Sequence, residues 1–132
     1  MKLRIRANTL RLRLVRAEVE QLLADGETRE AMAMPGAALG YALALREVGE
    51  PAATLTTGAG GAELRVLWPR AAVVAWANDA RAVSLRAVVT LAGTEPGLSL
   101  LVEKDFPCLV DREGEDDSDA FARPEDQPPQ TC

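Results

Sequence analysis

The chain has 132 residues, with 15 Lys and Arg against 20 Asp and Glu, and a formal net charge of −5. It contains no His, which excludes Ser-His-Asp and Cys-His nucleophile systems, imidazole metal ligands and an imidazole proton shuttle. The length fits one domain with a single core, and 48% hydrophobic with 27% charged residues is typical of a globular protein.

Residues 2–14 alternate between apolar and basic side chains, which predicts extended strand. The apolar positions change from odd to even numbers at Asn8-Thr9. Such a phase change needs either a bulge within one strand or a tight turn between two strands, and the sequence leaves both open. In either case the basic residues share strand faces opposite the apolar ones.

Apolar residues at helical spacing predict two short helices, over 16–25 and 69–79. Gly26 is a good stop for the first helix, but no Ser, Thr, Asp or Asn precedes that helix as a cap. Pro69 suits the first turn of the second helix. Trp68 and Trp76 both lie on apolar faces, so we expect them in the core.

The remaining strands are predicted at 29–34, 38–46, 52–57, 62–68, 82–91 and 98–106. Gly and Pro residues predict turns at Pro35-Gly36 and at Gly58-Ala59-Gly60-Gly61. Because the stretch at 37–47 is rich in Ala, a helix there is a competing prediction. The order strand, helix, strand, strand then occurs twice at a spacing of about 52–54 residues, which favours an internal duplication.

These elements predict an α+β fold with an antiparallel, strongly curved or barrel-like sheet of seven or eight strands and two short helices. The domain is expected over residues 1–110. Residues 111–132 hold eight acids and two bases, a net charge of −6, together with three Pro. This composition predicts a largely disordered acidic tail in which Phe121 is the exception that docks locally. Deletion of 112–132 is therefore expected to leave stability nearly unchanged.

Nothing in the composition indicates secretion or a cofactor. Basic residues interrupt the N-terminal stretch, so it does not read as a signal peptide, and no segment is long and apolar enough to span a membrane. Cys108 and Cys132 form neither a disulfide framework nor a zinc site. We therefore expect a cytoplasmic protein with no metal and no cofactor.

Both ends of the chain resemble a family of small uncharacterised bacterial proteins, a domain of unknown function. The similar stretches are MKLRIRANTLRLRLVRAEVEQL and LLVEKDFPCLVDREGEDDSDAF. Thr9 stands where the family usually has Ser, and the Ala-rich middle resembles the family poorly. The resemblance implies no catalytic residue.

The predicted architecture is also similar to the triphosphate tunnel (CYTH-like) enzymes, which are wide antiparallel barrels with charged strand faces inside. Those enzymes carry alternating Glu on the first strand, where this chain carries Lys2, Arg4 and Arg6. The opposite sign removes the metal-binding carboxylates. The similarity then implies only anion binding, as in a degenerate relative of these phosphatases.

The sequence shows no catalytic constellation and favours a small non-enzymatic binding or interaction protein. The alternative is a site for a small phosphate or carboxylate ligand, because Arg binds such anions with paired hydrogen bonds. Glu103 and Asp105 share a strand face and are predicted to pair with the basic strand. A protein partner fits as well, whereas the acidic total disfavours nucleic acid. The candidate anion ligands are Arg4, Arg6, Arg11, Arg13, Arg65 and Lys104.

Overall fold

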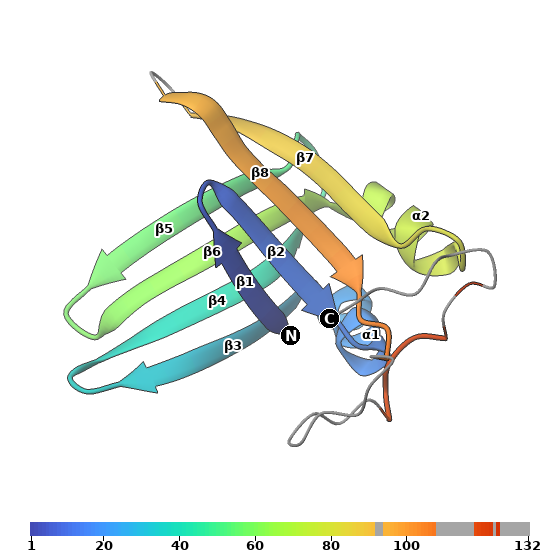
Figure 1. Cartoon of the computed structure of the whole chain (residues 1–132), viewed down its shortest axis with the longest axis horizontal. Helices are drawn as coiled ribbons and strands as arrows, with labels where there is room; N and C mark the ends of the chain where they lie inside the picture. Colours follow the sequence, from blue (N-terminus) through green and yellow to red (C-terminus); the bar gives the residue numbers. More distant parts are fainter. Residues whose placement is uncertain (92–93, 108–117, 123, 125–132) are drawn as a thin grey trace.

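The computed structural model describes residues 1–91, 94–107, 118–122 and 124, and has eight strands and two helices in these residues (Figure 1). The predicted α+β class is confirmed, and strands and helices lie close to their predicted positions. Cys108 and Cys132 lie outside the described residues. In chain order the elements are β1 (Lys2–Arg6), β2 (Thr9–Leu14), α1 (Arg16–Asp25), β3 (Glu27–Met34), β4 (Ala37–Arg46), β5 (Ala52–Gly58), β6 (Gly61–Pro69), α2 (Arg70–Asn78), β7 (Ser84–Leu91) and β8 (Thr94–Lys104).

The strands form two separate sheets of four strands each. Sheet A has the order β1-β2-β8-β7, and sheet B has the order β3-β4-β6-β5. The outer pairs of each sheet are antiparallel, but β2 pairs with β8, and β4 with β6, in parallel. Both sheets are therefore mixed and have open edges. The predictions of an antiparallel sheet and of a barrel-like closure are wrong, because local alternation does not specify a strand's distant partner.

The phase change at Asn8-Thr9 is a turn between two strands. Arg6 pairs with Thr9 across a turn made by Ala7 and Asn8, and Ala7 has a φ of 46°. The Asn8 side chain donates to the Gly97 carbonyl at 2.9 Å, and the Ser99 amide donates to the Asn8 carbonyl at 2.9 Å. These contacts attach the β1–β2 hairpin to β8.

The Ala-rich stretch at 37–47 is strand rather than helix. Ala37–Arg46 forms β4, which is central in sheet B and has neighbours on both sides. Ala42 and Ala44 of β4 are small enough for charged side chains of the neighbouring strands to cover them, since Ala42 pairs with Arg29 and Arg65 and Ala44 pairs with Glu27. Sheet pairing thus overrides the weak strand propensity of Ala.

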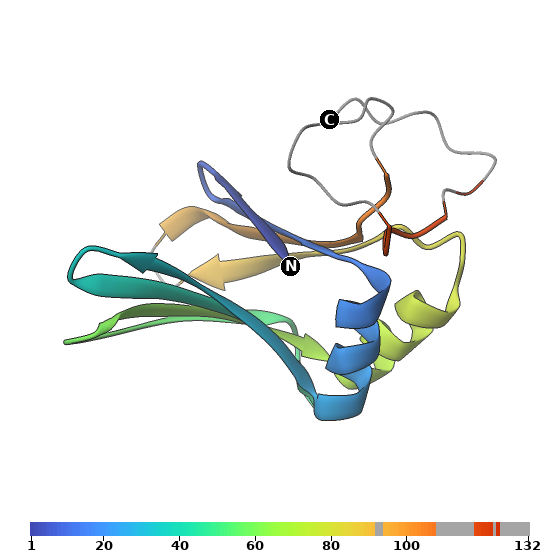
Figure 2. The same cartoon turned by 90° about the horizontal axis from the view of Figure 1, so that it is seen from below.

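The core lies between the inner faces of the two sheets and against both helices, which sit at the same end of the sheets (Figure 2). Its largest fully buried side chains come from β2, α1, β4, β6, α2 and β8: Leu12, Leu14, Leu22, Leu43, Val66, Val73 and Val102. Trp68 and Trp76 are each 3% exposed, which confirms their predicted place in the core.

The two halves of the chain repeat one pattern of elements and exchange hairpins. Strands β1–β4 with α1, and β5–β8 with α2, have the order strand, strand, helix, strand, strand. Each sheet combines the first hairpin of one half with the second hairpin of the other. Val19 and Leu22 of α1 are buried as Val73 and Trp76 of α2 are, at the spacing that the sequence indicates.

Candidate functional site

The outer face of sheet A carries most of the basic residues singled out from the sequence. Strand pairing places Arg4, Arg11, Leu101 and Arg86 in one row across all four strands. Side chains of directly paired residues lie on the same face of a sheet. We call this surface the cationic face; its basic residues are Lys2, Arg4, Arg6, Arg11, Arg13 and Arg86.

Two buried carboxylates lie against one end of the cationic face. Arg11 Nε donates to Glu103 Oε2 at 2.6 Å, and Arg13 Nε lies 3.6 Å from the same oxygen. Lys2 Nζ lies 3.0 Å from Asp105 Oδ2. Glu103 is 5% exposed and Asp105 is 3% exposed. Both acids therefore pair with the basic strands β1 and β2 and help to hold β8 beside them.

The other end of the cationic face is not neutralised in this way. Arg4 and Arg6 are exposed, and neither has an ion-pair partner among residues 1–91, 94–107, 118–122 and 124. Arg4 lies directly opposite Arg11 in the register of β1 and β2. Like charges in directly opposed positions destabilise a strand pair. An external anion at this position would relieve that repulsion.

Two shallow depressions lie on the cationic face and meet at Thr9 and Leu101. One, of about 440 Å³, is lined by Arg4, Arg6, Ala7, Thr9, Arg11 and Leu101. The other, of about 470 Å³, is lined by Thr9, Arg86, Ala87, Val88, Ser99, Leu100 and Leu101. Guanidinium and hydroxyl donors thus surround a surface large enough for a small ligand.

Arg65 is not part of this surface. It lies on the outer face of sheet B, where Arg65 Nη2 is 2.5 Å from Glu27 Oε2 and Arg65 Nε is 3.5 Å from Glu63 Oε1. Arg29 also contacts Glu63. The structure therefore separates Arg65 from the other candidate arginines and places it in a balanced network.

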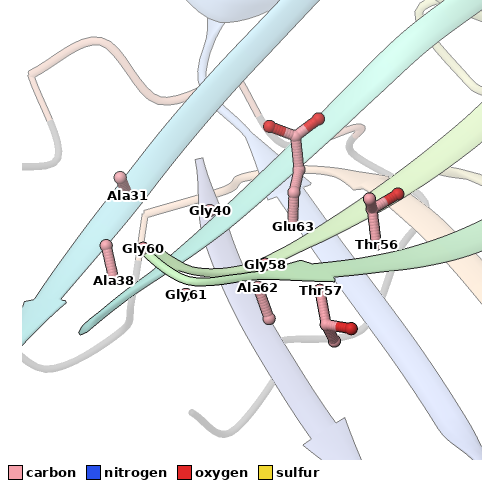
Figure 3. A pocket seen from close by; sticks show the side chains of 10 residues that line it. All are labelled: Ala31, Ala38, Gly40, Thr56, Thr57, Gly58, Gly60, Gly61, Ala62 and Glu63. Atoms are coloured by element: carbon pink, nitrogen blue, oxygen red, sulfur yellow. The ribbon is translucent and has the colours of Figure 1, made fainter.

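A third depression, of about 490 Å³, lies near this network on sheet B (Figure 3). Its lining is mostly Ala, Gly and Thr, and its one charged residue is Glu63, which already contacts Arg29 and Arg65. The hollow exists because Ala38 has only a methyl side chain and Gly40 has none. Nothing in its lining selects a charged ligand.

Lys104 points away from the cationic face, into the core side of sheet A. It is 4% exposed, and its ammonium donates to the Asp79 carbonyl at 2.7 Å. The ammonium also lies 5.4 Å from the Trp76 ring centroid and 5.5 Å from that of Phe121, in cation–π contact with both. Lys104 is thus a structural residue of the core rather than an anion ligand.

The pKa of Lys104 is lowered from its ordinary value of 10.5 because burial disfavours the charged form, and the charge of Asp79 opposes this effect. Between that lowered pKa and 10.5 the unfolded chain binds more protons, so the free energy of unfolding rises with pH. The variant Lys104→Met has no ammonium to titrate, so this rise in the free energy of unfolding is lost. Denaturant unfolding at a series of pH values that approach 10 should show the free energy of unfolding of wild type increasing relative to that of the variant as pH rises. A pH-independent difference would contradict the prediction.

Tyr41 has an effect of opposite sign at the top of this pH range. Wild type and Lys104→Met both carry Tyr41, so its effect cancels in the difference between them. Burial, and then the charge of Glu30, raise the pKa of Tyr41 above its ordinary 10.0. The folded chain then keeps a proton that the unfolded chain loses, so Tyr41 makes stability fall with pH above 10.

The short segment 118–122 lies against α1 and the end of β8. The sequence predicts that Phe121 docks, but it does not predict the contacts of Asp119. The Ala17 amide donates to Asp119 Oδ2 at 2.9 Å, and the Arg16 amide donates to the Asp119 carbonyl at 3.1 Å. Asp119 therefore supplies the helix cap that is missing from the local sequence of α1. In the sequence, the missing local cap of α1 is the one sign that a residue far along the chain supplies it.

Phe121 docks as predicted. Its ring packs edge-on against Phe106 with centroids 6.4 Å apart, and its amide donates to the Asp105 carbonyl at 2.8 Å. Because Asp119 contacts α1 and Phe121 packs on Phe106, we now expect deletion of 112–132 to lower stability, in place of the expectation from the sequence that stability stays nearly unchanged.

In the described part of the chain, which contains no His or Cys, the Asp and Glu residues nowhere gather in threes as metal ligands. Among the same residues, no helix has the length and apolar character needed to cross a membrane.

Comparison with known proteins gives one match. No curated protein matches the chain, and no solved structure does. A family model described as a family of unknown function, DUF7009, matches residues 1–125, which includes both sheets, both helices and the segment 118–122. The chain therefore belongs to the DUF7009 family.

Proposed function

We propose that this chain is a small non-enzymatic binding protein, and that its cationic face binds an anionic ligand that carries phosphate groups. The observation that carries the proposal is the pair Arg4 and Arg6, which has no ion-pair partner among the described residues and lies beside Arg11 around a depression of about 440 Å³. Arg is suited to this task because its planar guanidinium donates two parallel hydrogen bonds to phosphate or carboxylate oxygens.

The layout of the face favours a ligand with more than one anionic group. Arg4 on β1 and Arg86 on β7 stand at opposite edges of sheet A, in the same row. Three strand spacings of about 4.8 Å separate these two edges. Thr9 and Ser99 place hydroxyl groups on the sheet between them. An oligophosphate fits this arrangement better than a single phosphate.

The charged surface lies outside the sheets, and both sheets are open. In the tunnel enzymes the charged faces point into a closed barrel. The proposal therefore rests on the cationic face alone and does not include relationship to those phosphatases. A cytoplasmic location accords with this function and is proposed with it.

Thermal unfolding with added anions tests the proposal. Pyrophosphate and tripolyphosphate should raise the melting temperature of wild type, since a ligand at a hundred times its Kd adds about 2.7 kcal/mol. The variant Arg4→Ala/Arg6→Ala should lose most of this shift. Arg65→Ala removes one arginine from sheet B, and this variant should keep the full shift in melting temperature.

Two controls separate the site from general charge effects. Sodium chloride at matched ionic strength should give a much smaller shift, because screening acts on exposed charges everywhere. Citrate in place of the phosphates distinguishes carboxylate from phosphate ligands. The proposal fails if millimolar oligophosphate leaves wild type unchanged, or shifts the double variant equally.

A further inference from the structure

Two open sheets leave four edge strands, and three of them carry features that discourage pairing with another chain. Exposed edges present unpaired backbone groups, and proteins protect them with charged side chains or bulges. β1 has three charged residues, β3 has three, and β7 has Arg86 and an irregular register between Val89 and Leu91.

β5, the fourth edge, has none of these features. Its sequence AATLTTG contains no charged residue and no Pro, and the residues from Thr54 to Gly58 are all exposed. Leu55 projects from the inner face of sheet B with 65% of its surface exposed. Thr and Leu suit a strand, and the β5–β6 pairing continues without irregularity from Ala52 to Gly58. β5 is therefore a regular strand, and no other strand in the described part of the chain pairs with its outer edge.

We propose that β5 is a self-association surface, on which the β5 strand of a second copy of this chain pairs antiparallel about Leu55. The two copies of sheet B then form one continuous sheet of eight strands. The interface is isologous, because each copy contributes the same strand to a two-fold arrangement.

The sequence of β5 complements itself in this register. Leu55 faces Leu55 of the second copy, and Thr54 faces Thr56 of the second copy. Thr–Thr pairs and apolar pairs in opposed positions stabilise antiparallel strands. No like charges meet along the strand. The same arrangement of β1 would oppose Arg and Lys residues, which disfavours that edge.

The neighbouring charges do not oppose this approach. On β6, the strand next to β5, the outer-face residues Glu63 and Arg65 are already joined to Arg29 and Glu27 of the same copy. One strand pair buries less than the roughly 1,200 Å² of a standard stable interface. The association is therefore weak, and the dimer fraction rises with protein concentration.

Sedimentation equilibrium on the full chain, up to millimolar concentration, tests this inference. Wild type should shift from the monomer mass toward twice that mass. Leu55→Lys should stay monomeric, because two lysines would meet at the two-fold axis. Ile5→Lys is the matched control, since Ile5 is also an exposed inner-face residue (59%) on an edge strand. It should dimerise as wild type does.

Thiol crosslinking tests the register directly. In a background with Cys108→Ser and Cys132→Ser, Leu55→Cys should crosslink two copies through a short bifunctional thiol reagent. Thr57→Cys should crosslink much less, because Thr57 faces Ala53 of the second copy. The crosslinked fraction for Leu55→Cys should exceed that for Thr57→Cys at least several-fold.

Three results would each overturn the proposal. These are a wild type that remains monomeric at millimolar concentration, a dimer that persists in Leu55→Lys, and crosslinking of Thr57→Cys that equals or exceeds that of Leu55→Cys. Circular dichroism of each variant shows whether it is folded. If Leu55→Lys is misfolded, Thr56→Lys replaces it, because Thr56 is exposed on the outer face of the same strand.

Discussion

A chain that stops after residue 117 will melt about 10 °C below the full-length chain, whereas a chain that stops after residue 124 will melt near it. The first loses the segment 118–122, which caps α1 and packs on Lys104 and Phe106. A lost helix cap costs about 1 kcal/mol, and removal of a partly buried aromatic side chain costs about 2 kcal/mol. Differential scanning calorimetry of the two truncated chains measures the difference.

Point variants separate the contribution of Asp119 to this stability from that of Phe121. Asp119→Asn keeps an oxygen that accepts from the Ala17 amide and should lose less stability than Asp119→Ala. Phe121→Leu should lose less than Phe121→Ala, because it keeps apolar contact but loses the aromatic ring over Lys104. Equal melting temperatures for the two truncated chains would show that the segment contributes nothing.

Glu103→Gln will lower the free energy of unfolding by about 3 kcal/mol, because two guanidinium groups lose the buried carboxylate between strands β2 and β8. The amide of Gln fills the same space but carries no charge. The basic residues of β1 and β2 then repel one another with less compensation. Urea unfolding at low salt measures the loss.

An exposed ion pair is the control for Glu103. Glu47 has a side chain 77% exposed and contacts Arg70, so Glu47→Gln should change stability by less than about 0.5 kcal/mol. Added salt should restore part of the loss in Glu103→Gln, because screening weakens repulsion on the cationic face. If salt does not narrow the gap to wild type, the loss comes from packing and hydrogen bonding instead.

Much of the local structure follows from alternation and turn residues. The alternating stretches assign Leu10, Leu12 and Leu14 to one face and Arg11 and Arg13 to the other, as the structure has them. Helix α1 spans its predicted residues. It ends at Asp25 because Gly26 adopts the left-handed conformation. These signals act within a few residues of each other.

Non-local pairing is what the sequence did not reveal. The parallel contact of β2 with β8 joins residues some ninety positions apart, and alternation is the same for parallel and antiparallel neighbours. This pairing places Glu103 beside Arg13, in agreement with the predicted contact of Glu103 and Asp105 with the basic strand. The pairing of β4 with β6, which the sequence did not reveal, places Arg65 on the other sheet. The grouping of Arg4, Arg6, Arg11 and Arg13 was predictable because all four sit on one short hairpin.

The exchange of hairpins between the halves sets an order for folding during synthesis. Sheet B needs the chain only as far as Pro69, so it can assemble while β7 and β8 are still being made. Sheet A must wait for β8, because that strand alone joins the β1–β2 hairpin to β7. Within these 132 residues, the β1–β2 hairpin is synthesised first and is among the last elements to find its partner. Such distant contacts slow folding, and the charges on β1 protect that waiting hairpin from pairing with other chains.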